Sequence, residues 1–370
     1  MGLIWRKIMS EQNNLHTALQ RLAVNAAEFP ANSAVANYLV WLSDLLEHRD
    51  ERFLKEYLPI IRENSTRDHT KNPFLSIITR TQGNRPEMLQ EALLSLAAQS
   101  DEDFELILIG HKVSKAQDAE IKNILARQPS ALQDKIRYLT LDHGNRTTPI
   151  NYGFAHAHGA YAAVLDDDDI AFDHYVESFH KAAEEGYGPL LHAYVALQPW
   201  KTLETEQGLA LYSAGSPYDL YCRDFHMVSQ FEDNKCPLMA IAFPLIYFQK
   251  YGILFDEGCN VREDWDYIMR LASLVGVKDI PEVTALYRVW QNAPNSSTVH
   301  DQTEWEENYA FLTERFKQMP VLIPAGMEKF EMREPAAQPS LRTMLKDRLR
   351  KYLPTPLLRL YRMLRRTKGV

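Results

Sequence analysis

The chain has few cysteines and no long apolar segment. Its 370 residues include only Cys222, Cys236 and Cys259, too few and too irregularly spaced for a disulfide framework or a structural zinc site. The amino terminus lacks the apolar run of a signal peptide, and the longest apolar stretch, Met239–Phe248, is far below the ~20 residues that cross a bilayer. We therefore predict a cytoplasmic protein without a membrane-spanning helix.

Charge is distributed unevenly along the chain. The net charge is -8 at pH 7, yet residues 340–370 hold ten Lys or Arg and one acid, Asp347. The acidic remainder argues against nucleic-acid binding. Leucine and tyrosine alternate with the basic residues of the tail, as in helices that lie on an anionic membrane surface. We predict that residues 340–370 contact the inner face of the cytoplasmic membrane; an ordinary basic helix packed on the body remains the alternative.

The hydrophobic pattern predicts an α/β domain with helical attachments at both ends. Residues 1–70 show apolar positions three and four apart and form a predicted helical segment, and residues 301–370 form another that ends in the basic tail. Between them, residues 71–300 alternate apolar strands with helices, which is typical of a mostly parallel sheet covered by helices. The predicted strands are 75–79, 104–109, 136–141, 160–165, 190–196, 240–243 and 283–289, and the main helices are 86–99, 114–127, 149–158, 173–185 and 264–275.

Four consecutive aspartates, Asp166 to Asp169, follow a predicted buried strand. Ligands of such sheets bind at the carboxyl ends of the strands. Adjacent carboxylates repel one another unless they are solvated, protonated or neutralised by a cation, and their oxygens suit Mg²⁺ or Mn²⁺. If the run is extended, Asp166 and Asp168 share one face and Asp167 points away. The alternative is a solvated loop in which Asp169 or Asp173 caps the next helix.

Several ordered motifs together resemble family 2 glycosyltransferases with the GT-A fold. They are LSIITRTQGNRPEMLQEALLSLAAQSDEDFELILIG, NRTTPINYGFAHAHGAY, LDDDD, FDEGCNVREDWDYIMRLA and ALYRVW, and they extend from about residue 74 to 300. The resemblance implies transfer of a sugar from a nucleotide-sugar donor, expected to be a UDP-sugar, to a saccharide or lipid-linked acceptor. The relatives in question are bacterial enzymes of polysaccharide and lipopolysaccharide synthesis.

The same resemblance implies a donor site and a metal site, with Mn²⁺ or Mg²⁺ as the cofactor. Asp168 would hold the ion that bridges the donor diphosphate, and His300 is the nearest candidate for a histidine that relatives carry where this chain has Trp290. An acid that relatives use to bind the base is replaced here by Gly110 and His111. The implied donor-binding residues are Thr79, Arg80, Thr81, Arg85, Asn151, Asp166 and Asp167.

The pair Glu263 and Asp264 resembles the catalytic acidic pair of the family. In an inverting reaction one carboxylate removes the proton of the acceptor hydroxyl, and Asp264 is the predicted base, with Glu263 beside it. The alternative is a cap at the start of the following helix. Trp265 and Asp266 are expected to shape the acceptor pocket or fix this helix, with Trp265 a candidate for stacking on a sugar ring.

Two other functions stay open at this point. A sugar nucleotidyltransferase shares a related sheet, but it normally needs a glycine-rich loop after the first strand, where this chain offers only Gly83. A module that binds a nucleotide sugar without catalysis would explain the departures at Gly110, His111 and Trp290. Both acidic motifs are present, which favours the enzyme.

Overall fold

The computed structural model describes residues 38, 41, 51–65, 72–183, 188–206, 208–292 and 302–319. It divides into two units, 1–322 and 323–370, and the second lies wholly outside the described residues. His300, the basic tail and most of the predicted amino-terminal segment also lie outside them. The domain boundaries given above therefore stay predictions. No helix among the described residues combines the length and apolar character needed to cross a bilayer.

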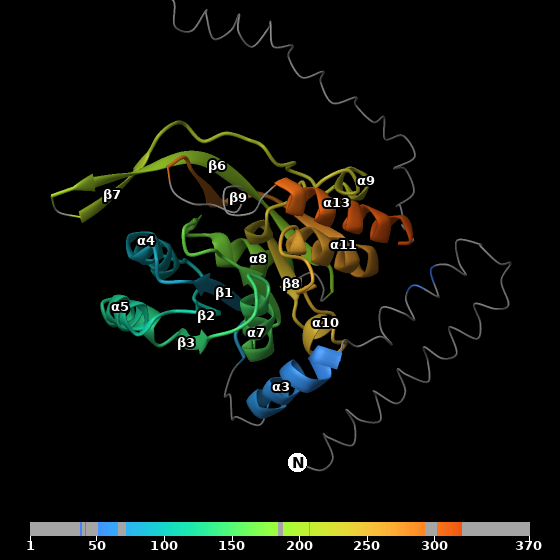
Figure 1. The fold of residues 1–370 in the computed structure, drawn as a ribbon, viewed down its shortest axis with the longest axis horizontal. Helices are drawn as coiled ribbons and strands as arrows, with labels where there is room; N and C mark the ends of the chain where they lie inside the picture. Colours follow the sequence, from blue (N-terminus) through green and yellow to red (C-terminus); the bar gives the residue numbers. More distant parts are fainter. Residues whose placement is uncertain are drawn as a thin grey trace, which may run out of the picture. The chain divides into compact units, whose positions relative to one another are not determined.

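A nine-stranded sheet is the centre of the described chain (Figure 1). Its order is β3-β2-β1-β4-β8-β6-β9-β5, and β7 pairs with β6. Pairing is parallel across β3-β2-β1-β4 and between β6 and β9, and antiparallel elsewhere. The predicted α/β sheet is confirmed, with antiparallel members that the alternation of strands and helices did not reveal. The strands are β1 (Leu75–Thr81), β2 (Phe104–His111), β3 (Ile136–Leu141), β4 (Tyr161–Val164), β5 (Ile170–Ala171), β6 (Leu190–Thr205), β7 (Gly208–Ser213), β8 (Ile241–Pro244) and β9 (Val277–Trp290).

The helices begin and end where local signals place them. α4 starts at Pro86, whose missing N–H costs nothing in a first turn, and α5 is preceded by a capping box of Ser114 and Gln117. α11 ends at Val275 and is capped by Gly276, whose positive φ of 74° favours glycine. The helices are η1 (Phe53–Tyr57), α3 (Leu58–Ser65), α4 (Pro86–Ala97), α5 (Lys115–Ala126), α6 (Ser130–Gln133), α7 (Thr148–His156), α8 (Tyr175–Ala183), α9 (Met227–Gln230), η2 (Leu238–Ala240), α10 (Ile246–Gln249), α11 (Glu263–Val275) and α13 (Gln302–Lys317).

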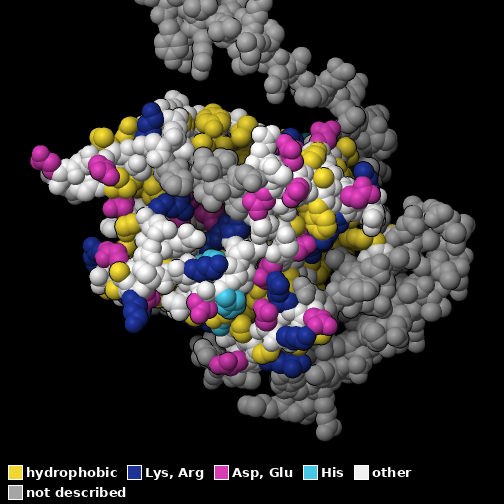
Figure 2. All heavy atoms as spheres, viewed as in Figure 1, with side chains coloured by type: hydrophobic (Ala, Val, Ile, Leu, Met, Phe, Trp, Pro, Cys, Tyr) yellow, Lys and Arg dark blue, Asp and Glu magenta, His cyan; other side chains and the backbone are white. Residues whose placement is uncertain are grey.

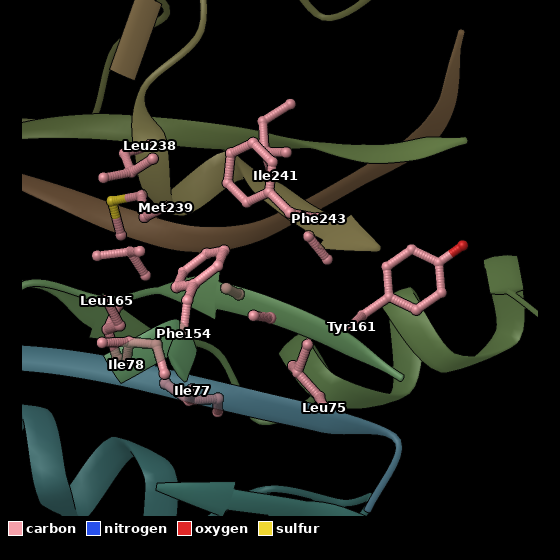
Figure 3. Close-up of a cluster of buried hydrophobic side chains, with 14 of the residues drawn as sticks. Leu75, Ile77, Ile78, Phe154, Tyr161, Leu165, Leu238, Met239, Ile241 and Phe243 are labelled. Carbon is pink, nitrogen blue, oxygen red and sulfur yellow. The ribbon is translucent and has the colours of Figure 1, made fainter. Parts of the chain in front are cut away.

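The core lies where β1 and β4 meet α7 and the segment around β8. Figure 3 shows Ile78, Leu165 and Phe154 pointing toward Met239 and Phe243, and all of them are buried. α7 packs closely on β1 because position 153 is glycine: a Cβ there would lie 2.5 Å from the Cγ2 of Ile78. This packing fixes the ends of β1 and β4 side by side, and the polar residues that follow both strands are thereby brought together.

β6 and β9 are longer than their apolar segments predicted. Their parallel pairing continues to Trp200 and Trp290, while the outer end of β6 is exposed and forms a hairpin with β7. Hydrogen bonds between the strands, rather than burial, hold this extension. A pattern of apolar residues cannot predict such a segment.

Candidate functional site

Arg80, at the end of β1, contacts both acidic elements singled out in the sequence. Its Nε lies 3.0 Å from Oδ1 of Asp166, and its Nη1 lies 3.6 Å from Oε1 of Glu263. Asp166 follows β4, and Glu263 begins α11. One guanidinium therefore joins the aspartate run to the Glu263–Asp264 pair, and the two predicted acidic elements share one site. Figure 2 shows basic and acidic side chains meeting in a hollow at the centre of the face in view.

A second arginine completes the environment of Glu263. Arg146 Nε lies 3.0 Å from the same Oε1, and the carbonyl oxygen of Arg146 accepts a hydrogen bond of 2.6 Å from Arg80. The Glu263 side chain is only 2% exposed. A carboxylate buried to this extent needs such partners, because an unpaired buried charge is strongly destabilising. Glu263 thus positions two arginines beneath the site.

Arg85 holds two members of the aspartate run at once. Its two terminal nitrogens pair with the carboxylates of Asp167 and Asp168, and Thr81 donates a hydrogen bond of 2.5 Å to Asp167. The expected orientation of Asp167, away from its neighbours' site, is therefore wrong. The cause is a turn, in which the N–H of Asp169 bonds to the carbonyl of Asp166, so the alternation of an extended strand does not apply.

Asp169 is tied to β9 and does not serve as the alternative helix cap. Its Oδ1 accepts a hydrogen bond of 2.8 Å from the backbone N–H of Arg288. The guanidinium of Arg288 lies 5.2 Å from the ring of Trp200 and 5.1 Å from that of Trp290, while its Nε donates to the carbonyl of Asp168. Trp290, the position at which the family resemblance implied a histidine, thus helps to hold an arginine under the aspartate run.

Within the run, only Asp166 and Asp168 are partly exposed, with 34% and 16% of their side chains accessible. Burial opposes ionisation of Asp166, but the charge of Arg80 holds its pKa below the usual value. For Asp168, burial and the charges of Asp167 and Asp166 raise the pKa to about 6, although Arg85 acts in the opposite direction. These two carboxylates are the ones that an incoming cation could reach.

Their oxygens are hard ligands of the kind that Mg²⁺ and Mn²⁺ prefer. The raised pKa of Asp168 means that added positive charge would be favourable there. No group of three or more His, Cys, Asp or Glu among the described residues is arranged to hold a metal ion.

Asp264 lies half-buried at the start of α11. Its two oxygens accept hydrogen bonds from the backbone N–H of Trp265 at 2.8 Å and from the amide of Asn234 at 3.0 Å. Burial, followed by the charge of Glu263, raises the pKa of Asp264 to about 6. The contact with the Trp265 N–H is of the kind expected for the alternative role at the start of the helix, and the two hydrogen bonds hold the carboxylate in one orientation.

Tyr221 was not predicted as a site residue. Burial raises the pKa of its hydroxyl, and the charges of Asp264 and Asp169 raise it further. The residue belongs to an irregular segment between β7 and α9. No periodicity or motif in that segment distinguishes this tyrosine from its neighbours.

Residues 76–207 match the family model described as glycosyl transferase family 2. Over these residues the chain is similar to that family. An uncharacterized glycosyltransferase of Rickettsia prowazekii (strain Madrid E) is 23% identical to it over 265 residues, which are 70% of this chain and 78% of that protein.

Solved structures of glycosyltransferases align with the chain at low identity. S. aureus TarS 1–349 in complex with UDP-GlcNAc aligns with a TM-score of 0.49 and 15% identity over 65% of each chain. The mannosyltransferase PcManGT from Pyrobaculum calidifontis, in complex with GDP-Man and Mn²⁺, aligns with a TM-score of 0.44 and 13% identity over 76% of this chain and 70% of that one. The chain spans 60% of the length of TarS 1–349 in another crystal structure.

Trp265 is a core residue. It is 0% exposed, its indole N–H donates a hydrogen bond of 2.6 Å to the carbonyl of Gln230, and it packs in a cluster with Leu312 and Phe316. Stacking of Trp265 on a sugar ring is therefore excluded by burial. Its neighbour Asp266 fixes the helix, as expected, through ion pairs with Arg270 and Arg315.

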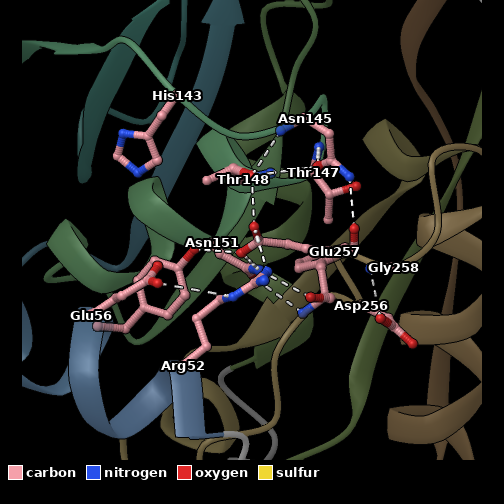
Figure 4. Close-up of polar contacts among 12 residues, drawn as sticks. Arg52, Glu56, His143, Asn145, Thr147, Thr148, Asn151, Asp256, Glu257 and Gly258 are labelled. Carbon is pink, nitrogen blue, oxygen red and sulfur yellow. Dashed lines mark hydrogen bonds and ion pairs between the residues drawn. The ribbon is translucent and has the colours of Figure 1, made fainter.

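Asn151 is also fully buried (Figure 4). Its amide group bonds to the backbone N–H and carbonyl of Phe255 and to Oε1 of Glu257. Arg52 and Thr148 converge on the same glutamate. Asn151 thus holds the loop that precedes α11, and the donor contact predicted for it stays a prediction that this geometry does not favour.

The missing acid after β2 has a steric explanation. A Cβ at Gly110 would lie 2.6 Å from the hydroxyl of Tyr138, which is itself bonded to Asp118. No side chain fits at position 110 unless Tyr138 moves. At the next position, His111 is buried and its Nε2 lies 2.9 Å from the carbonyl of His143. Thr79, another predicted donor-binding residue, is 2% exposed at the end of β1.

Proposed function

We propose that this chain is an inverting, metal-dependent glycosyltransferase that moves a sugar from a nucleotide-sugar donor, a UDP-sugar, to a hydroxyl of a saccharide or lipid-linked acceptor. One observation carries the proposal: Arg80 contacts both Asp166 and Glu263. The group that would bind the donor and the group that would activate the acceptor are thus close enough to act on one sugar. The family 2 match supports the reaction class.

A divalent ion, Mn²⁺ or Mg²⁺, would be held by Asp168 with Asp166 beside it, and the diphosphate would supply further ligands. When bound, such an ion neutralises the charge that develops on the leaving nucleoside diphosphate. Arg85 pairs with Asp168 in the free protein, so it competes with the cation for that carboxylate. His300, outside the described residues, remains a proposed additional ligand.

The donor would lie along the ends of β1 and β4. Thr79 and Thr81 are proposed to meet the nucleotide, and Arg80 and Arg85 to meet its diphosphate. Asp167 acts through Arg85, because its carboxylate is 3% exposed and pairs with that guanidinium. Each of these contacts is a proposal about the bound state.

Asp264 would act as the general base. Its carboxylate takes the proton of the acceptor hydroxyl while the hydroxyl oxygen bonds to the anomeric carbon on the face opposite the diphosphate. The bond from that carbon to the diphosphate oxygen breaks, and its electron pair leaves with the nucleoside diphosphate. A pKa of about 6 suits this role, because the group is ionised at pH 7 yet is more basic than an ordinary aspartate.

The acidic limb of the pH–rate profile should move when the partners of Asp264 change. Only ionised Asp264 accepts a proton, so activity should fall as the pH drops below about 6. Asn234→Ala removes a donor that stabilises the ionised form, which raises the pKa and should move the limb up by about one pH unit. Glu263→Gln removes a like charge and should move the limb down. Profiles of kcat/KM that shift together, or not at all, would contradict Asp264 as the base.

The reaction class itself is tested by nucleotide release. Purified full-length chain is incubated with UDP-, GDP- and TDP-sugars in Mn²⁺ or Mg²⁺, and release of nucleoside diphosphate is measured with and without chelator. We expect nucleoside diphosphate to be released from donors of one nucleotide class, and we expect the chelator to abolish that release. Pyrophosphate formation from a nucleoside triphosphate and a sugar phosphate would instead identify a nucleotidyltransferase, and donor binding without any turnover would identify a binding module.

The place of action is a further part of the proposal. The acceptor class and the cell-surface polysaccharide context suggest the cytoplasmic face of the membrane, reached through residues 340–370. The contribution of residues 340–370 to membrane binding is measured separately from catalysis. The test compares binding to anionic vesicles by the full chain and by a chain that ends at residue 339.

A further inference from the structure

We propose that the groove beside Asp264 binds the acceptor and selects an uncharged or amino-bearing saccharide over an anionic one. This inference rests on the proposed transferase function and names the substrate class of the same site. The groove has a volume of about 500 Å³, within the range of small-molecule sites. Its walls include Glu232, Asp233 and Arg262 on one side and Trp305, Glu306 and Tyr309 of α13 on the other.

The groove is connected directly to the proposed base. Arg262 lies two residues before Asp264 and donates a hydrogen bond of 2.6 Å to Asp233. The next residue, Asn234, donates the bond of 3.0 Å to the Asp264 carboxylate. The wall formed by Asp233 and Arg262 therefore continues into Asn234 and Asp264, so a saccharide in the groove would lie next to the proposed base.

The aromatic side of the groove has unmet hydrogen-bond donors. Trp305 is half-buried, and within the described part of the chain neither its Nε1 nor the Nε of Arg262 has an acceptor, although both atoms are buried. Buried donors are almost always paired, so a ligand with several hydroxyl oxygens would complete this site. An indole ring also offers an apolar face for the C–H surface of a sugar.

The positions of these groups are held by their surroundings. The Arg262 guanidinium lies 5.3 Å from the ring of Trp305 and 5.1 Å from that of Tyr309. Tyr309 stacks on Trp265, and its hydroxyl donates a hydrogen bond of 2.9 Å to the carbonyl of Glu232. Arg262 itself adopts a left-handed conformation, φ 65°, which is costly for arginine and is often retained at functional sites.

The wall formed by α13 is anchored to α11, beside which it lies in Figure 1. Arg315 of α13 bonds to Asp266 of α11 at 2.6 Å and to Asp256 at 2.7 Å. Leu312 and Phe316 pack with Trp265 in a separate buried cluster. The groove is therefore a preformed feature of the described chain, and a ligand need not order its walls.

Charge gives the groove its selectivity. Three acids, Glu232, Asp233 and Glu306, line it together with one cation, Arg262, which already pairs with Asp233. Figure 2 shows acidic side chains among hydrophobic ones on the face over α11 and α13. Like charge juxtaposed in a binding site costs affinity, so uronate or phosphate groups are disfavoured. Carboxylates accept hydrogen bonds from hydroxyl or ammonium groups of a sugar.

Binding of three probes to the full chain tests the proposal: cellotriose, triacetylchitotriose and trigalacturonic acid, each followed by saturation-transfer NMR and titration. We expect at least one neutral trisaccharide to bind, with trigalacturonic acid about tenfold weaker or worse. Trp305→Ala should weaken binding of the neutral probe by about tenfold, because the aromatic contact is lost. Glu306→Lys should strengthen the binding of trigalacturonic acid. Glu307→Lys, on the same helix but outside the groove, should leave that binding unchanged.

The proposal is overturned if no neutral probe binds, if the anionic probe binds as tightly, or if Trp305→Ala or Glu306→Lys behaves like the Glu307→Lys control. Release of nucleotide from the donor, measured without acceptor, tests the proposed transferase function separately from the groove proposal. Glu307→Lys, outside the groove, should retain that release. A wild-type chain that binds the neutral probe but releases no nucleotide from any donor would refute the transferase and leave the groove as a saccharide site.

Discussion

Replacing Asp264 by asparagine is expected to lower the turnover of sugar transfer by about 10²- to 10⁴-fold, the usual contribution of a positioned proton acceptor. The amide keeps the size of the side chain and one acceptor for the Trp265 N–H, but it cannot take the proton of the acceptor hydroxyl. Donor affinity should remain nearly unchanged, because Asp264 is proposed to face the acceptor. Initial rates and donor titrations on the same preparation measure the two effects separately.

A matched control for this substitution is Asp142→Asn, at a side chain that is 100% exposed. It should retain normal rates. If Asp264→Asn also retained most of its activity, the assignment of the base would be wrong. If it lost donor binding in proportion to its rate, Asp264 would belong to the donor site, and the division of roles between the two acidic elements would fail.

Replacing Asp168 by alanine is expected to weaken metal-dependent donor binding by about 100-fold or more, since a bound divalent ion supplies several kcal/mol at a developing anionic charge. The loss should appear in Mn²⁺ binding itself and in donor titrations with Mn²⁺. In chelator, wild-type protein and the variant should bind the donor equally weakly. Calorimetric titrations with Mn²⁺ alone, with donor alone and with both measure these terms.

The matched control for Asp168→Ala is Asp173→Ala, a few residues further along the same segment and mostly exposed. Thermal unfolding gives a second check. Burial and like charges raise the pKa of Asp168 to about 6, so the carboxylate is mostly ionised at pH 7 but is less favourable in the fold than in the unfolded chain, and its removal should not lower the melting temperature. Donor binding that persists in Asp168→Ala and still responds to Mn²⁺ would place the ion elsewhere.

The sequence predicted the elements of the site better than their contacts. The aspartate run, the Glu263–Asp264 pair and Arg80 were all identified from strand ends and motif order. That one guanidinium bridges Asp166 and Glu263 could not be predicted, because it depends on side-chain directions of residues 86 and 183 positions away from Arg80 along the chain. Only the packed sheet determines which residues face each other at such separations.

The failures have the same origin. Trp265 was a candidate for stacking on a sugar because it follows the acidic pair, yet α13 packs on it, and the tryptophan that lines the groove is Trp305, forty residues later. Asp167 was misplaced because a turn replaced the extended backbone. Gly110 looked like a lost acid, whereas the hydroxyl of Tyr138 from the next strand occupies its space. Tertiary packing determines each of these positions, and local sequence patterns do not predict tertiary packing.

A crystal structure of the full chain with Mn²⁺ and an uncleavable nucleotide-sugar analogue tests the central claim most directly. The account predicts the ion against the Asp168 carboxylate and the anomeric carbon between that ion and Asp264, with the side opposite the diphosphate open toward the base. Density for the analogue in another cavity, or an anomeric carbon that faces away from Asp264, would contradict it.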